Sequence, residues 1–141
     1  MQKPSTTTLS AMTKPADEKI TINVGCVDLG QIDLLVQEGF YANRTDLIRT
    51  AIRNQLTTHS EVVRQVVRRK TLALGIQHFS QSDLLALLAA GEKLHIRVLG
   101  LASIAPEVSP ELALATIESI TVLGALHASP AVKAALLSRT R

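Results

Sequence analysis

The feature that most constrains the fold is a strand-like segment, residues 19–24, that has no evident partner nearby in the sequence. In KITINV, β-branched apolar residues alternate strictly with polar ones, a pattern typical of a half-buried strand. The backbone groups of a strand need a ladder partner, and no segment with matching alternation follows within the next fifty residues. The simplest partner is the same strand of a second copy, paired antiparallel about a two-fold axis.

Two helices are predicted after this strand. The first, in DLGQIDLLVQEG, has Asp28 as its N-cap and stops at Gly39. The second, in NRTDLIRTAIRNQL, has Asn43 as its N-cap and an acidic residue three positions later, as in a capping box. A weak break at residues 57–59 is followed by further helical spacing, so helix is expected to about residue 70.

The segment KITINV…GFYANRTDLIRTAIRNQL, within residues 18–58, resembles the ribbon-helix-helix family of DNA-binding proteins, the CopG, Arc and MetJ class. The resemblance implies that strands of two chains form an antiparallel ribbon that fits the major groove of DNA. It further implies that the outward residues Lys19, Thr21 and Asn23 read base edges. The double-stranded DNA partner is thus an expectation from the resemblance, and so is the homodimer.

The same resemblance assigns two further groups of residues. Backbone N–H groups near Asn43, Arg44 and Thr45, at the start of the second helix, are expected to bind a DNA phosphate, with help from the helix dipole. The intertwined dimer core is expected to contain Ile20, Ile22, Val24, Ile32, Leu35, Leu47, Ile48, Ile52 and Leu56. The alternative is a ribbon that only dimerises.

The second half of the chain contains an internal repeat of 24 residues. IRVLG at 96–100 recurs as ITVLG at 120–124, and a weaker copy at 72–76 has its glycine displaced by one position. Each unit is predicted to contain a strand that ends at the glycine, a turn and a helix. Ser109-Pro110 and Ser129-Pro130 provide an N-cap followed by proline at N1, and Ser80 or Ser82 provides the cap in the first unit.

The predicted fold class is therefore α+β, with an N-terminal ribbon-helix-helix dimerising module followed by a small, solenoid-like C-terminal β/α repeat domain. Few repeat units leave open strand edges, which must be capped or must associate. We expect residues 72–141 to form higher homo-oligomers or to dock another protein. A self-contained βαβα domain remains an equal alternative.

Composition sets the domain limits. Residues 1–17 contain two prolines and no apolar periodicity, so a disordered arm is expected there. The predicted domains are then 18–58 for DNA binding and dimerisation, 59–71 as a helical linker and 72–141 as the repeat domain. The excess of Lys and Arg over Asp and Glu lies wholly in the first 70 residues.

Several functions lack support in the sequence. No nucleotide-binding or hydrolase motif is present, so no enzyme activity and no cofactor are expected. The four histidines, at 59, 78, 95 and 127, do not cluster at ligand spacing, although the last two lie near the repeated strands. No apolar run is long enough to span a bilayer and no signal peptide is seen, so a cytoplasmic protein with no membrane contact is expected.

The sequence thus predicts a sequence-specific DNA-binding transcriptional regulator, specifically a repressor, whose C-terminal repeats mediate further assembly. The alternative is a scaffold or filament-forming protein in which the ribbon only dimerises. An antitoxin is disfavoured because the C-terminal half is apolar and patterned, unlike a disordered toxin-binding tail.

Overall fold

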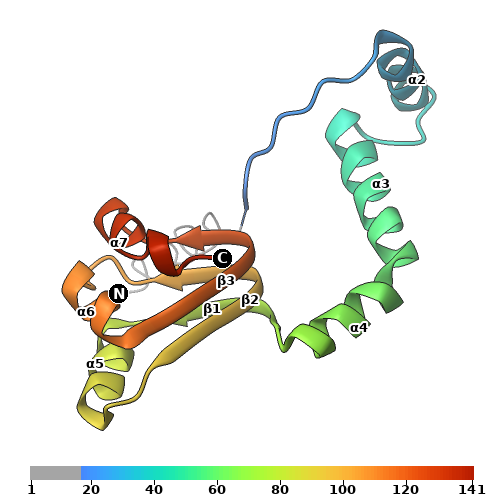
Figure 1. Cartoon of the computed structure of the whole chain (residues 1–141). Coiled ribbons are helices and arrows are strands. Elements are labelled where there is room, and N and C mark those ends of the chain that lie inside the picture. The colour runs from blue at the N-terminus through green and yellow to red at the C-terminus, as the bar shows by residue number, and fades with distance from the viewer. Residues whose placement is uncertain (1–16) are drawn as a thin grey trace, which may run out of the picture. The chain divides into compact units, whose positions relative to one another are not determined.

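The computed structural model describes residues 17–141, so nearly all of the predicted N-terminal arm lies outside the described part of the chain. The described residues form two compact units (Figure 1). The N-terminal unit comprises Lys19–Val66, and the C-terminal unit comprises Val67–Arg141 together with Asp17 and Glu18. Each unit is described by itself.

The N-terminal unit contains an extended segment followed by helices. Helix α2 spans Cys26–Gln37, α3 spans Arg44–Thr58 and α4, which continues into the C-terminal unit, spans Ser60–Lys70. Residues 17–25 form neither a helix nor a strand ladder within the single chain. None of these three helices contains a buried residue.

The start of α2 differs from the prediction. Gly25, not Asp28, is the N-cap residue, and Asp28 lies within the first turn, where a carboxylate interacts favourably with the helix dipole. The predicted end is confirmed. Gly39 has φ +86°, and the N–H groups of Gly39 and Phe40 donate to the carbonyls of Val36 and Leu35 at 3.1 and 3.0 Å. This is the Schellman arrangement that glycine favours.

The start of α3 follows the sequence prediction. Asn43 accepts a hydrogen bond from the Asp46 N–H at 2.8 Å, while the Asp46 carboxylate accepts one from the Ala42 N–H at 2.9 Å. In the usual capping box the acidic side chain accepts from the N–H of the N-cap residue itself, whereas Asp46 accepts from the N–H of the residue before it, Ala42. The predicted break also occurs, because α3 ends with His59 as its C-cap and α4 begins directly afterwards.

The C-terminal unit is a parallel three-stranded sheet with the strand order β1-β2-β3. Strand β1 spans Ala73–Phe79, β2 spans Leu94–Ile104 and β3 spans Ile117–His127. Three helices cover one face in a row (Figure 1). They are α5 (Gln81–Ala90), α6 (Pro110–Thr116) and α7 (Pro130–Ala135), and a 3-10 helix, η2 (Leu137–Arg139), follows.

Helices α5, α6 and α7 each begin with a serine N-cap. The Ser80, Ser109 and Ser129 side chains accept hydrogen bonds from the backbone N–H groups three residues later, at 3.1–3.2 Å. Ser80 also forms a complete capping box with Asp83, which decides between the two predicted cap candidates. The caps at Ser109 and Ser129 are followed by proline at the first helical position, as the sequence predicts.

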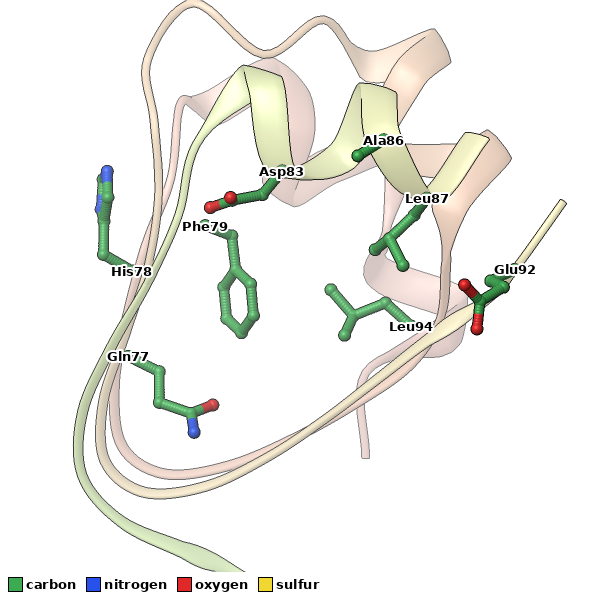
Figure 2. A pocket seen from close by; sticks show the side chains of 8 residues that line it. All are labelled: Gln77, His78, Phe79, Asp83, Ala86, Leu87, Glu92 and Leu94. Carbon is green, nitrogen blue, oxygen red and sulfur yellow. The ribbon is translucent and has the colours of Figure 1, made fainter. Parts of the chain in front are cut away.

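The strand register carries the sequence repeat into space. Gly100 pairs with Gly124, at the 24-residue offset, and Gly75 pairs with Gly100, which accounts for the displaced glycine of the first unit. The prediction that each strand ends at its glycine is wrong. The strands continue through these glycines, whose φ values are +124°, +140° and +122° from β1 to β3. The three strands bend together (Figure 2).

The row of glycines has a steric cause. A Cβ on Gly100 would overlap the carbonyl oxygen of Gly75, and one on Gly124 would overlap that of Gly100. Positive φ disfavours any other residue as well. A continuous core fills the space between the sheet and its helices, with Leu84, Ile96, Val98, Ile117, Ile120, Val132 and Leu136 all at most 1% exposed.

Candidate nucleic-acid interface

The extended segment before α2 exposes both of its faces in the single chain. Lys19, Thr21 and Asn23, the predicted base-reading residues, are exposed. So are the apolar residues between them, since Ile20 is 77% and Ile22 66% exposed. Exposing apolar side chains to water is unfavourable, and so is leaving backbone hydrogen-bonding groups without protein partners. A second strand paired with this segment would bury the side chains and satisfy the backbone groups.

The helices that follow have the same property. Leu47 is half-buried, whereas the other predicted dimer-core residues of α3, Ile48, Ile52 and Leu56, are exposed. In α2, Val27, Leu34 and Leu35 are exposed, and Phe40 is exposed in the following turn. An apolar surface this large on a 48-residue segment marks an association surface.

The start of α3 holds the predicted phosphate-binding residues. The Asn43 side chain accepts a hydrogen bond from the Asp46 N–H alone. The N–H groups of Arg44 and Thr45 therefore have no acceptor within the described chain. The guanidinium of Arg44 is engaged elsewhere. Its Nε and Nη2 atoms donate to the two carboxylate oxygens of Asp33 at 2.7 and 2.8 Å. This two-point ion pair joins α3 to α2.

The pair also shifts both titrations. The hydrogen bond from Arg44, supported by its charge, lowers the pKa of the Asp33 carboxyl, and Asp33 raises the pKa of Arg44. Both side chains are about half exposed, so solvent screens the pair. Sequence reasoning missed Asp33, since nothing in the spacing of two helices indicates which exposed charges will meet.

A shallow hollow of about 380 Å³ lies beside this helix start. Asn43 and Thr45 line it together with two arginines that the sequence analysis did not single out, Arg49 and Arg53. The signal was present, because positions 45, 49 and 53 recur at the four-residue spacing that places side chains on one helix face. Two further cations therefore flank the unpaired N–H groups, where Arg44 alone was expected. Asp46 also lines the hollow and opposes an anion there.

Four further basic residues, Arg64, Arg68, Arg69 and Lys70, lie on α4. Arg64 pairs with Glu61 at 2.7 Å. Arg68, Arg69 and Lys70 occupy the last turn, where cations interact favourably with the helix dipole. These positions fit a solvated helix face.

The histidines are dispersed. His78 and His95 each lie within hydrogen-bond distance of the serine beside them on the next strand, Ser103 and Ser119, and His127 pairs with Glu18. The register places His95 opposite Ser119 and His127 opposite Ser103, at opposite ends of the β2–β3 ladder. His95 and His127, which both lie near the repeated strands in the sequence, therefore do not come together.

An extended segment with alternating faces, two helices with uncovered apolar sides and a basic helix start define the class of dimeric ribbon-and-two-helix DNA-binding modules. The chain belongs to the Ribbon-Helix-Helix transcriptional regulator family, whose model matches residues 15–133. The resemblance seen in the sequence is thereby confirmed, and the match extends beyond residues 18–58 to take in all three strands of the C-terminal sheet. Comparison with curated proteins gave no match, and comparison with solved structures gave none either.

Family membership establishes the general function. The chain is a DNA-binding transcriptional regulator that dimerises, and its family is one of regulators rather than enzymes. The described helices include none with both the length and the apolar character needed to cross a membrane.

Proposed function

We propose that this regulator is a sequence-specific repressor that inserts an intermolecular two-stranded ribbon, residues 19–24 of two chains, into the major groove. Lys19, Thr21 and Asn23 read base edges. Lysine can donate to guanine O6 and N7, asparagine can bond adenine N6 and N7 together, and threonine can bond either base or contact the thymine methyl. Occupying a promoter in this way represses it.

The observation that carries this proposal is the exposed, unpaired segment at residues 19–24. Its apolar residues are exposed alongside its polar ones in the single chain. Pairing with a second copy would satisfy the backbone and bury Ile20, Ile22 and Val24 against α2 and α3, which leaves the polar face outward. A two-stranded ribbon has the width that the major groove admits.

Phosphate binding would orient the ribbon. The free N–H groups of Arg44 and Thr45 point along the axis of α3 at its positive end, and Arg49 and Arg53 line the same hollow. In this proposal Arg44 acts chiefly by joining the two helices through Asp33, and its neighbours supply the mobile positive charge. Phosphate contacts position the protein without reading sequence.

In this proposal the protein acts in the cytoplasm, and its C-terminal unit joins dimers into a higher homo-oligomer. The unit can do so because it is a short repeat whose sheet is left open at the β1 end. Cooperative binding to tandem half-sites would then add affinity that one short ribbon lacks. The alternative, a scaffold that uses the ribbon only to dimerise, predicts particle mass that grows with protein concentration and no preferred duplex. Light scattering with and without DNA separates the two.

The direct test is selection of bound duplexes from a random pool, followed by binding measurements at several salt concentrations. We expect a two-fold-related or tandem motif with affinity well above the non-specific background. A featureless pool, with weak binding that disappears in modest salt, would contradict sequence-specific repression.

The base-reading residues are tested by Lys19→Ala and Asn23→Ala. Each should relax the preference at one position of the motif by about 1–3 kcal/mol, without loss of the dimer. Lys133→Ala, a change of an exposed lysine in the C-terminal unit, is the matched control and should leave the motif intact. An unchanged motif in both ribbon variants would refute the assignment.

A further inference from the structure

The two edge strands of the C-terminal sheet, β1 and β3, differ in how far other residues cover them. At β3, the last residues of the chain lie against the strand edge, where Thr140 bridges to Ile120 and the Arg141 N–H donates to the Ile120 carbonyl at 2.8 Å. Arg139 also donates to the Leu114 and Ile117 carbonyls at 2.6 and 2.7 Å. These contacts cover part of the β3 edge.

The β1 end carries no such cover among the described residues. Strand β1 pairs only with β2, and Leu74 and Ile76, on either side of its glycine, are 71% and 66% exposed. Because β1 begins opposite Val98, the first part of β2 lacks a neighbour on this side. A groove of about 560 Å³ opens there. Phe79, Leu87 and Leu94 point into it, while His78 points away (Figure 2).

The bend of the sheet restricts what can pair with this edge. Any strand that continues the sheet beyond β1 must bend at the level of Gly75, and the bend uses a positive φ that glycine adopts most readily. A Cβ on Gly75 would meet nothing within 4 Å, so the space beside the glycine is free. A strand with a glycine at the right position is supplied by the same chain, in β1 itself.

We propose that the β1 edge binds the β1 edge of a second copy, antiparallel about a two-fold axis through Gly75. This inference rests on the proposed assembly role and names its surface. With Gly75 on the axis, Leu74 of each copy lies opposite Ile76 of the other on the outer face, so two exposed apolar residues cover two others. Because the axis passes through the bend, the two copies of β1 bend at the same point and can stay paired along their length.

The helix row supports the same arrangement. Leu85 and Leu88 of α5, the helix that follows β1, are each about half exposed and three residues apart, hence on one side of the helix. Helix α6 packs on α5, and α7 packs on α6, so α5 is the uncovered end of the row. A two-fold axis through the bend brings the two copies of α5 together over the grooves. Head-to-tail addition would instead need the β3 edge, which the C-terminal residues partly occupy.

Disulfide cross-linking tests the register. In full-length protein carrying Cys26→Ser, the pair Leu74→Cys and Ile76→Cys should give a covalent two-chain species under mild oxidation, because opposite Cβ atoms lie about 5 Å apart. The pair Leu74→Cys and Leu123→Cys should give none. The reverse result, with cross-linking only in the second pair, would show head-to-tail addition and overturn the proposal, as would cross-linking in neither.

A charge exchange provides a second test without cysteines. Leu74→Glu with Ile76→Glu places like charges opposite each other, so the association of C-terminal units should weaken at least tenfold in sedimentation. Leu74→Glu with Ile76→Lys should restore it, and Leu123→Glu, on the other edge, should leave it unchanged. Failure of the exchange to restore association would refute the two-fold register.

Duplex selection with the same variants separates the two proposals. If the selected motif persists in variants that no longer associate through β1, the ribbon reads DNA independently of this surface. If cross-linking fails while a motif is still selected, the edge pairing is wrong and the repressor proposal stands. Cross-linking without any selected motif would support the edge pairing and contradict the repressor proposal.

Discussion

The N-terminal and C-terminal units solve the problem of burying apolar surface in opposite ways. Residues 26–70 form three helices without one buried residue, whereas the C-terminal unit closes a core around β2 and β3 within a single chain. The N-terminal unit has one short extended segment, helices α2 and α3 and most of α4, with no sheet for them to cover, while the C-terminal unit places helices over a sheet.

Because of this difference, stability should depend on protein concentration in the N-terminal unit and not in the C-terminal unit. A unit whose apolar residues are covered by a second copy gains stability by mass action, and its unfolding cannot be separated from dimer dissociation. A unit with its own core unfolds with a free energy that is independent of concentration, apart from any contribution of its open β1 end. Three experiments test this contrast between the units.

The largest effect is expected for Gly100→Ala. The new methyl group would overlap the Gly75 carbonyl at a residue with φ +140°, so we expect a loss of about 4 kcal/mol or more from the C-terminal unit. Chemical denaturation should show its transition displaced or absent, while the concentration-dependent transition persists.

Gly30→Ala is the matched control, since Gly30 lies within α2 and a methyl group there would meet nothing within 4 Å. It should stabilise the helix by about 0.5–1 kcal/mol. Destabilisation by Gly30→Ala would show that a second copy approaches this glycine closely.

An intermediate effect is expected for Ile22→Asp. In the single chain Ile22 is exposed, so a monomeric N-terminal unit would tolerate the change. In a ribbon dimer the carboxylate would be buried at the interface, and we expect dimer affinity to fall at least 100-fold, about 3 kcal/mol, with loss of DNA binding. Leu137→Asp, at a residue with similar exposure in the C-terminal unit, should change stability by less than about 0.5 kcal/mol. Analytical ultracentrifugation measures the dimer in both variants, and an undisturbed dimer in Ile22→Asp would disprove the ribbon interface.

The smallest effect concerns acid and salt. The pKa of Asp33 is lowered by its hydrogen bonds from Arg44, and that of Asp83 by hydrogen bonds from the Ser80 backbone and hydroxyl. A carboxyl with a folded-state pKa below its unfolded value stabilises the fold above that value, about 3.9, and the contribution is lost as pH falls through the folded-state pKa.

Asp33→Asn should therefore reduce the acid dependence of the N-terminal unit's unfolding, which depends on protein concentration. Asp83→Asn should reduce the acid dependence of the C-terminal unit's unfolding, which does not. Salt distinguishes the two, since the exposed Asp33–Arg44 pair is screened, whereas the capping box at Ser80 relies on short local hydrogen bonds. Thermal melts from neutral pH down to well below about 3.9, the unfolded-state pKa, at low and high salt, give both comparisons. An effect of Asp33→Asn on the concentration-independent transition would contradict the assignment.

Local signals in the sequence predicted the structure correctly where the interaction itself is local. Asn43, Ser80, Ser109 and Ser129 cap their helices because a short polar side chain reaches an N–H group three residues away, whatever the rest of the chain does. The 24-residue period likewise predicted which residues align, since Gly100 and Gly124 lie side by side at that offset. The prediction for Asp28 was wrong because the helix already begins after Gly25, which leaves Asp28 inside its first turn.

Residue patterns alone therefore predicted the starts of α3, α6 and α7, the 24-residue period and the family to which the ribbon and turn point. Three features became visible only in the fold: the path of the strands through their glycines, the ion pair between Asp33 and Arg44, and the open end of the sheet at β1. The physical reason is range. A cap depends on neighbours in the sequence, whereas the bend shared by three strands requires glycine at position 100 because the carbonyl of Gly75, on the neighbouring strand, lies where a side chain would be.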